Sequence, residues 1–293
     1  MTGDAPAIGF LGIGLMGEPM VLRLLSLGHR VHAWNFVPGR TARIEAAGAV
    51  VHEDAASVAR AADIVLACVL DTDAVENSVF GPGGVAQGAA PGKVLVDMST
   101  TQPDRSREMA MRLRRETGMG WVDAPVSGGP PAAAAGKLAI MAGGSDADIE
   151  RVRPVMAQLG QSFTHMGGEG AGQLTKLVNQ VIVCTNFAVL AEALSFAERA
   201  GIDAARVPEA LSGGYADTPM LRHFYPRMLR RDFAPAGYAR QVLKDLDMVQ
   251  ATAKELKAPM PMTSQAATLY RFAVARGLAE MDAVSVFRLF EEE

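Results

Sequence analysis

The sequence contains few of the residues that mark a secreted, membrane or metal-dependent protein. Only two cysteines occur, Cys68 and Cys184, and each lies inside an apolar run. We therefore expect buried thiols in a reducing compartment, and neither a disulfide nor a metal site. The first residues show no basic stretch followed by an apolar core, so we expect no signal peptide. The apolar run 177–191 is interrupted by three amide side chains and is short for a membrane span. These features predict a cytoplasmic protein.

Excess charge of either sign is also absent. The net charge is −4 and no basic stripe is visible, so we expect neither nucleic acid nor a membrane as a partner. The five histidines are scattered, with no spacing typical of metal ligands, and no GxSxG elbow occurs. The 293 residues are 49% hydrophobic and 20% charged, which is typical of a globular protein with one large or two ordinary domains.

A glycine-rich turn near the N-terminus is the first positive signal. The apolar run 7–11 is followed by a GxGxxG pattern, a helical segment that ends at Gly28, and an expected strand at 30–35. In this context the first glycine allows a tight turn, the second lets a pyrophosphate approach the backbone, and the third lets the helix pack on the strand. The helix N-terminus adds N–H groups and a positive dipole end. The residues expected to contact a dinucleotide cofactor here are Gly12, Gly14, Leu15, Met16 and Gly17.

The end of the second expected strand bears on which nicotinamide cofactor is bound. Asn35 follows Gly14 by 21 residues, where NAD-binding proteins carry an acidic residue that contacts the ribose. No carboxylate at that position repels a 2′-phosphate, and Arg40 is close enough in sequence to bind one. Asn35 can equally bind a plain 2′-hydroxyl, and Arg40 can be a solvated loop residue. The sequence favours NADP and leaves NAD open.

The remainder of the first half has the pattern of a doubly wound sheet, and the second half does not. Short apolar runs bounded by turn signals occur at 63–70, 93–98, 120–126, 137–143 and 163–166. They alternate with helical segments, which predicts an α/β Rossmann domain with a parallel-rich sheet and its ligand at the carboxyl ends of the strands. From 172 onward every segment is typical of a helix. We therefore expect a Rossmann domain over 1–166 and an all-helical domain over 167–293.

One long helix is expected to join the two domains. The segment from Gly172 to Gly201 has no internal proline, and its helix, over about residues 172–200, would be roughly 40 Å long. Lys176 and Asn179 lie three residues apart and so share a face of this apolar helix. A buried lysine is costly unless it has a function or a partner, and on spacing alone a functional and a snorkelling lysine are equally supported. The helix is apolar on more faces than one domain can cover, which predicts a homodimer or homotetramer.

Four motifs, taken together, resemble those of the β-hydroxyacid dehydrogenase family, which includes 3-hydroxyisobutyrate dehydrogenase and tartronate semialdehyde reductase. They are GFLGIGLMG at 9–17, DAPVSGG at 123–129 with Gly136, GQLTKLVN at 172–179, and KDL at 244–246. The resemblance spans most of the chain. It departs from the family at Asp71, where proline is frequent, and at Gln180, where a second asparagine is commoner.

The resemblance implies roles for particular residues. Lys176 would be the catalytic acid/base, Asn179 a substrate ligand, and Ser127, Gly128 and Gly129 the binding site for the substrate carboxylate. Thr100 and Lys244 would line the nicotinamide end, and Leu70 and Asp71 would also contact the cofactor. The chemistry agrees, because oxidation of an alcohol needs a base for the hydroxyl proton, and burial in an apolar cleft lowers the pKa of a lysine toward neutrality. Glycine N–H groups let a carboxylate come close to the backbone.

The sequence thus predicts an NAD(P)-dependent oxidoreductase for a small β-hydroxy acid or its semialdehyde. Two alternatives stay open: a reductase of glyoxylate or succinic semialdehyde, and a non-catalytic nicotinamide-binding regulatory protein. The second is disfavoured because a protein that only binds the cofactor needs no acid/base. A 6-phosphogluconate dehydrogenase is disfavoured because Val183 stands where those enzymes place a glutamate. Imine reductases usually replace the lysine that is present here.

Overall fold

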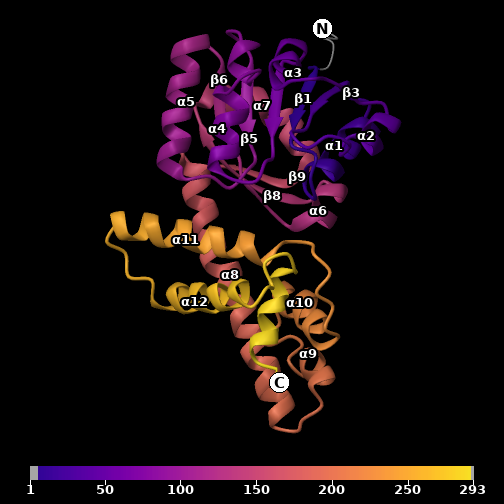
Figure 1. Ribbon diagram of the computed structural model, residues 1–293, viewed down its shortest axis with the longest axis vertical. Coiled ribbons are helices and arrows are strands. Elements are labelled where there is room, and N and C mark those ends of the chain that lie inside the picture. The colour runs from indigo at the N-terminus through magenta and orange to yellow at the C-terminus, as the bar shows by residue number, and fades with distance from the viewer. Residues whose placement is uncertain (1–5, 292–293) are drawn as a thin grey trace. The chain divides into compact units, whose positions relative to one another are not determined.

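The computed structural model describes residues 6–291, which divide into two compact units after Lys176 (Figure 1). The division falls inside a single helix, α8, which spans Ala171–Arg199. The first unit is built on a nine-stranded sheet and the second unit is helical. The expected fold class, an α/β Rossmann domain followed by an all-helical domain, is confirmed.

The sheet has the strand order β3-β2-β1-β4-β5-β6-β8-β7, with β9 paired to β8. Strands β1 to β6 are all parallel, whereas β8 runs antiparallel to both β6 and β7. The strands are β1 (Ile8–Leu11), β2 (Val31–Trp34), β3 (Val50–Val51), β4 (Ile64–Ala67), β5 (Val94–Asp97), β6 (Gly120–Asp123), β7 (Val126–Ser127), β8 (Leu138–Gly144) and β9 (Gly160–His165). This order reverses between β1 and β4, and ligands of such sheets bind outside the strand ends at that reversal.

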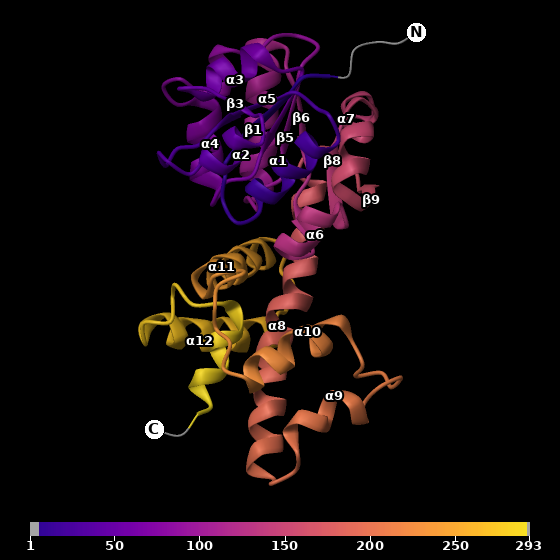
Figure 2. The ribbon, with the colours of Figure 1, turned by 90° about the vertical axis from the view of Figure 1, so that its right-hand side faces the viewer.

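Two hydrophobic clusters cover the two faces of the sheet. Alternate residues of β5 enter different clusters, with Val94 and Val96 in one and Leu95 in the other. The first cluster includes residues of α1 and α7, and the second includes residues of α3 and α5. Figure 2 shows α7 on one side of the strands and α3 and α4 on the other. The helices of this unit are α1 (Gly17–Ser26), α2 (Ala42–Ala46), α3 (Ala55–Ala61), α4 (Thr72–Phe80), α5 (Pro103–Thr117), α6 (Gly129–Ala135) and α7 (Asp146–Leu159), with a short 3-10 helix η1 (Val85–Gln87).

Three local features differ from the sequence-based expectation. The run 120–126 is not one strand, because β6 ends at Asp123 and β7 begins at Val126, after Pro125, which has no N–H for a ladder. The two-residue strand β3 was not expected. Strand β9 begins at Gly160, earlier than the expected 163–166. The outline of the sheet is unchanged by these differences.

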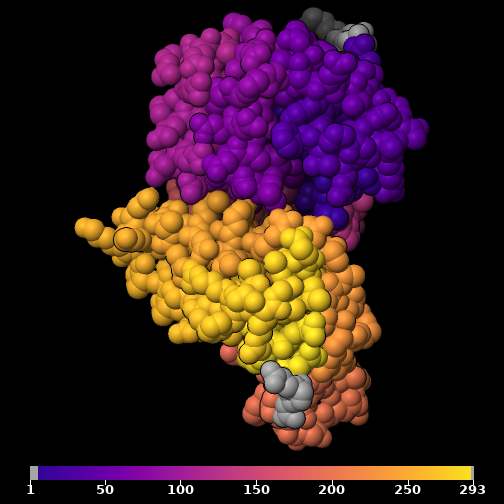
Figure 3. Space-filling view, in the orientation of Figure 1, coloured from indigo at the N-terminus to yellow at the C-terminus, as the bar shows by residue number. Residues whose placement is uncertain are grey.

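The second unit packs its helices around its own core. It comprises the rest of α8, the 3-10 helix η2 (Ala204–Arg206), α9 (Val207–Ala210), α10 (Pro219–Leu229), α11 (Ala239–Glu255), α12 (Pro261–Ala275) and the 3-10 helix η3 (Ala283–Leu289). Helices α11 and α12 lie side by side in both ribbon views. On the face seen in Figure 3, the surface of this unit is formed largely by α11, α12 and the C-terminal segment, coloured orange to yellow. Beyond α8, the described residues form no strand, only a bridge between Tyr238 and Asp282.

Helix α8 is, among the described residues, the one helix long and apolar enough to cross a membrane by length and composition. Its most apolar window is 44% buried inside the protein. Its first turn also binds polar groups at the strand ends: the Gln173 backbone N–H donates to Asp123, and the Gln173 side chain contacts the backbone of Ser99 and Thr101. These buried polar contacts are typical of a core helix.

Candidate functional site

The three glycines of the first turn have different surroundings. Gly12 has a φ of +92°, and a Cβ there would lie 2.3 Å from the Cys68 carbonyl oxygen, so the turn cannot accept a side chain. A Cβ on Gly17 would lie 1.9 Å from the Gly12 carbonyl oxygen. A Cβ on Gly14 would meet no atom within 4 Å. Gly12 and Gly17 are therefore required by packing, whereas Gly14 borders open space through which a ligand can reach the backbone.

The N-terminus of α1 completes this turn. The N-cap residue, Met16, makes no side-chain capping hydrogen bond to the first N–H groups of the helix. Leu15 is 43% exposed beside it. A helix N-terminus without a side-chain cap, next to an open glycine, suits a phosphate anion. The local structure thus fits the pyrophosphate of a dinucleotide cofactor.

Asn35 lies at the end of β2, where its side chain connects two loops. Its Oδ1 accepts a hydrogen bond from the Ile13 N–H at 2.8 Å, and its Nδ2 donates to the Val37 carbonyl oxygen at 2.8 Å. The amide therefore fixes the glycine-rich turn against the loop that leads to α2. An aspartate could accept the bond from the Ile13 N–H, but it has no N–H to donate to the Val37 carbonyl oxygen. The asparagine therefore has a structural function that the sequence did not reveal.

A cleft of about 510 Å³ opens beside the glycine-rich turn. It is lined by Ile13, Gly14, Leu15, Glu18, Pro19, Leu22, Arg23, Ser26, Arg40, Arg43, Pro130 and Ala134. Arg43 pairs with Glu18, with 2.6 Å between Nη1 and Oε1. Arg40 makes none of the hydrogen bonds or ion pairs found within residues 6–291, and its side chain is exposed. The cleft therefore presents an uncompensated cation, which favours an anionic ligand group.

The ends of β4 and β5 hold the other expected cofactor contacts. Leu70 is 47% exposed, and Thr100 is partly buried. Asp71 is the N-cap of α4, where its Oδ1 accepts a hydrogen bond from the Ala74 N–H at 2.8 Å. The loops after the two strands are joined by the Ser99 hydroxyl, which accepts from the Val69 N–H at 2.9 Å. The aspartate that departs from the family pattern thus stabilises the start of a helix.

Lys176 lies on α8 with only 8% of its surface exposed. Its Nζ donates a hydrogen bond to the Val126 carbonyl oxygen at 2.8 Å. That carbonyl immediately precedes Ser127, and the chain then turns through Gly128 and Gly129, whose φ angles are +130° and +71°. The structure therefore brings the Lys176 amine to the Ser127–Gly129 turn, although the lysine and the turn are about 50 residues apart in the sequence.

The second unit connects Asn179 and Lys244 through two buried side chains. The Asn179 Nδ2 donates to Gln180 Oε1 at 2.7 Å, and Gln180 Nε2 donates to Asp245 Oδ2. The other oxygen of Asp245 lies 3.2 Å from the Lys244 Nζ. Gln180 and Asp245 are each 8% exposed. Sequence reasoning assigned no role to Asp245 and treated Gln180 only as a departure from the family.

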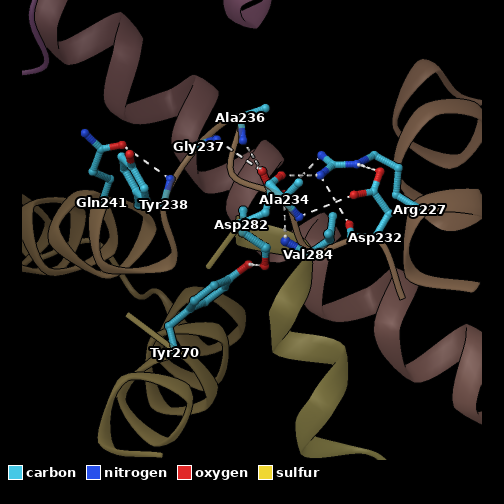
Figure 4. Close-up of polar contacts among 11 residues, drawn as sticks. Arg227, Asp232, Ala234, Ala236, Gly237, Tyr238, Gln241, Tyr270, Asp282 and Val284 are labelled. Atoms are coloured by element: carbon cyan, nitrogen blue, oxygen red, sulfur yellow. Dashed lines mark hydrogen bonds and ion pairs between the residues drawn. The ribbon is translucent and has the colours of Figure 1, made fainter. Parts of the chain in front are cut away.

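A buried ion pair holds the loop that leads into α11, the helix that carries Lys244. Arg227 lies 3.2 Å from Asp282, and the side chains are 11% and 3% exposed. The second Asp282 oxygen accepts from the N–H groups of Ala236 and Gly237 at 2.7 and 3.1 Å. Figure 4 shows Asp282 between Arg227 and this loop, which ends at Tyr238, the N-cap of α11. Because every polar atom of the carboxylate is used, the pair fixes the loop in one arrangement.

No group of three or more histidine, cysteine or acidic side chains suited to a metal ion occurs within the described part of the chain. The first unit instead presents the uncapped N-terminus of α1 at the glycine-rich turn and the buried Lys176 amine. This arrangement fits a dinucleotide cofactor and an acid/base group.

Comparison with known proteins identifies the family. A family model described as the NAD-binding domain of 6-phosphogluconate dehydrogenase matches residues 7–168. A second, described as the NAD-binding part of NADP-dependent 3-hydroxyisobutyrate dehydrogenase, matches residues 170–290. Together they cover nearly the whole chain.

Curated relatives and solved structures agree with these models. The chain is 38% identical to 2-hydroxy-3-oxopropionate reductase of Escherichia coli over 97% of each chain. It is 37% identical to 2-(hydroxymethyl)glutarate dehydrogenase of Eubacterium barkeri, covering 97% of this chain and 95% of the relative. The crystal structure of 3-hydroxyisobutyrate dehydrogenase from Salmonella typhimurium matches with a TM-score of 0.89 at 28% identity, covering 97% of this chain and 99% of that one. The chain therefore belongs to the 3-hydroxyisobutyrate dehydrogenase family and is an NAD(P)-dependent oxidoreductase of small β-hydroxy acids.

Proposed function

We propose that this enzyme interconverts a carboxylic acid bearing a hydroxymethyl group and the corresponding semialdehyde, with Lys176 as the general acid/base. The observation that carries the proposal is the hydrogen bond from the buried Lys176 amine to the Val126 carbonyl oxygen at 2.8 Å, beside the turn of Ser127, Gly128 and Gly129. A substrate whose carboxylate is bound at this turn would have its β-carbon within reach of the Lys176 amine. Asn179, which is three residues further along α8, would bind the same substrate.

The chemistry follows from these positions. When bound, the nicotinamide accepts or supplies the hydride. In the oxidation, Nζ takes the hydroxyl proton as the C–H electron pair leaves the carbon. In the reduction, the ammonium returns a proton to the carbonyl oxygen. General acid/base catalysis of this kind contributes about 10²- to 10⁴-fold to the rate.

The names of two relatives support the choice of substrate class. One is a reductase of 2-hydroxy-3-oxopropionate and the other a dehydrogenase of 2-(hydroxymethyl)glutarate. Both reactions interconvert a primary alcohol and an aldehyde one carbon away from the carbon that bears a carboxylate. We infer the same class here, with 2-hydroxy-3-oxopropionate and 3-hydroxyisobutyrate as its first candidates.

NADP is the proposed cofactor. Support comes from Asn35, which puts no negative charge beside a 2′-phosphate, and from the exposed Arg40 on the cleft. The family model that matches residues 170–290 is also described by reference to an NADP-dependent 3-hydroxyisobutyrate dehydrogenase. Residues 1–166 would hold the pyrophosphate of the cofactor at Gly12, Gly14, Leu15, Met16 and Gly17, with the nicotinamide end near Leu70, Asp71, Thr100 and Lys244. Residues 167–293 would form the helical domain.

A homo-oligomer in the cytoplasm is the proposed working form. Helix α8 exposes four large apolar side chains, at 61% for Val178, 57% for Ile182, 48% for Val189 and 75% for Phe196. Their spacing of four, seven and seven residues keeps them on one face of the helix. Coverage of this face by a second copy would remove it from water, as expected for a dimer or tetramer.

The test is the change in nicotinamide absorbance with the wild type and Lys176→Met side by side. The oxidation panel is 3-hydroxyisobutyrate, glycerate and L-serine, and the reduction panel is 2-hydroxy-3-oxopropionate, succinic semialdehyde and glyoxylate, each with NADP(H) and NAD(H). We expect turnover of a hydroxymethyl acid or its semialdehyde, lost in the variant. Turnover of glyoxylate or succinic semialdehyde alone would favour the alternative reductase. Cofactor binding without turnover of any compound would favour a regulatory protein.

A further inference from the structure

The first turn of α8 is attached to the ends of two strands by buried polar groups. Asp123, the last residue of β6, is fully buried. Its Oδ1 accepts from the Gly170 N–H at 2.7 Å and its Oδ2 from the Gln173 N–H at 2.9 Å. These N–H groups belong to the start of α8, where no intrahelical acceptor exists. A carboxylate from another element of the fold thus caps this helix.

The loop after the neighbouring strand, β5, binds the same turn of α8 through the Gln173 side chain. The side chain of Gln173 is fully buried, accepts from the Thr101 N–H at 3.0 Å and donates to the Ser99 carbonyl oxygen at 2.9 Å. Asp97 in turn accepts from the Ser99 N–H at 2.9 Å and from the Thr101 hydroxyl at 3.2 Å. Thr100, an expected cofactor contact, lies between these two anchored residues. The loop after β5 and the start of α8 are therefore held by one network.

Gly143 and Gly172 lie so close to Asp123 that a side chain at either position would collide with it. A Cβ on Gly172 would lie 2.5 Å from the Asp123 carbonyl oxygen and 2.8 Å from its Oδ2. A Cβ on Gly143 would lie 2.8 Å from Oδ1. Helix and strand can approach this closely only because neither position carries a side chain. The close approach in turn determines where the next turn of the helix lies.

That next turn carries Lys176, three residues after Gln173 and on the same face of the helix. We propose that Asp123 is a positioning residue for catalysis, because its carboxylate fixes the start of α8 and so places the Lys176 amine at the Ser127–Gly129 turn. The proposal rests on the proposed function of Lys176. It assigns to Asp123 no contact with substrate or cofactor, since its side chain is enclosed by β6 and the start of α8.

The test compares Asp123→Asn with the wild type in the reduction of 2-hydroxy-3-oxopropionate by NADPH at about pH 8, where the Asp123 carboxyl group, with its pKa raised to about 7, is ionised. An amide of the same shape can accept one of the two N–H bonds and must direct its NH₂ group at the other donor. A displacement of a reacting group by about 1 Å can lower the rate about 100-fold, so we expect kcat to fall 10- to 100-fold. The dissociation constant for NADPH, measured by fluorescence titration, should stay within about twofold, because the glycine-rich turn is unchanged.

A matched control and a second variant make the result decisive. Asp54 also caps a helix with its carboxylate, accepting from the Ser57 N–H at 2.7 Å at the start of α3. Asp54→Asn should leave kcat unchanged and change Tm little, because asparagine caps a helix about as well as aspartate. If Asp123→Asn does not fold, Gln173→Met removes the other half of the network without changing charge and should show the same fall in kcat.

Two results would overturn the proposal: a kcat within about twofold of the wild type in the folded variant, or a loss of NADPH affinity equal to the loss of kcat. The proposed function fails in a different way, either by absence of turnover in the wild type or by full activity of Lys176→Met. The two failures are therefore distinguishable.

Discussion

Substitution of alanine for individual glycines of the first turn separates ligand binding from packing. In Gly14→Ala the new Cβ meets no protein atom within 4 Å, and the φ of Gly14 lies outside the left-handed region. Stability should therefore be unchanged or rise by about 0.4–1 kcal/mol, because alanine restricts the unfolded chain. The methyl group would occupy the space through which a pyrophosphate reaches the backbone. Loss of one charge-assisted hydrogen bond, worth about 1.5–3 kcal/mol, corresponds to a roughly 10- to 150-fold weaker NADPH affinity.

Gly17→Ala should behave in the opposite way. Its Cβ would lie 1.9 Å from the Gly12 carbonyl oxygen, so the backbone must shift at a cost of about 3 kcal/mol. That cost corresponds to a fall in Tm of roughly 10 °C for a domain of this size. Thermal unfolding without cofactor and fluorescence titration with NADPH give both quantities for each variant. Wild-type affinity in Gly14→Ala, or a destabilisation equal to that of Gly17→Ala, would refute the assignment of this turn to the cofactor.

Three further predictions concern cofactor choice, pH and assembly. Asn35→Asp keeps an acceptor for the Ile13 N–H, loses the bond to Val37 and adds a negative charge beside the expected 2′-phosphate. Because that charge repels the phosphate, KM for NADPH should rise at least about tenfold, and KM for NADH should change less. Equal changes in the two KM values would contradict the NADP preference. Burial, and to a lesser extent the nearby Asp97, raises the pKa of Asp123 to about 7, so the stability from this group is present below its unfolded pKa near 4 and is lost as pH rises through 7. In denaturant titrations the free energy of unfolding of the wild type should fall on the order of 4 kcal/mol from pH 4 to 7, and that of Asp123→Asn should not. If the free energies of unfolding of the two proteins changed in parallel with pH, Asp123 would not be the group responsible. Phe196→Glu places a charge on the exposed apolar face of α8 and should lower the molar mass measured by light scattering, whereas a wild type that is already a monomer would contradict the proposed assembly.

Much of the fold could be predicted because its signals are local. The order of turn, helix and strand around the glycine-rich segment, and the change from strands to helices near residue 170, depend on neighbouring residues. Strand β3 was missed because two residues carry no periodicity. The run 120–126 was interpreted as one strand because its apolar character continues past Pro125, although the ladder does not.

The site shows a similar division between local and distant partners. Asp71 accepts from Ala74, three residues away, and the pattern of an aspartate before a helix could have indicated this cap. Asp123 and Gln173 are 50 residues apart, and Gln180 and Asp245 are 65 apart. No spacing in the sequence indicates such pairs, because they meet only when strand ends and helices are brought together. Asn35 was interpreted as a cofactor contact from its position alone, and the structure adds its bonds to Ile13 and Val37.

The central claim is that the Lys176 amine transfers the proton. A single-turnover, stopped-flow measurement of NADPH oxidation with 2-hydroxy-3-oxopropionate tests it most directly, because product release is excluded. For Lys176→Ala we expect a rate lower by about 10²- to 10⁴-fold, restored in part by added ethylamine, which can enter the space left by the side chain. Binding of NADPH should be unchanged. A rate in Lys176→Ala within tenfold of the wild type, with no effect of the amine, would show that another group transfers the proton.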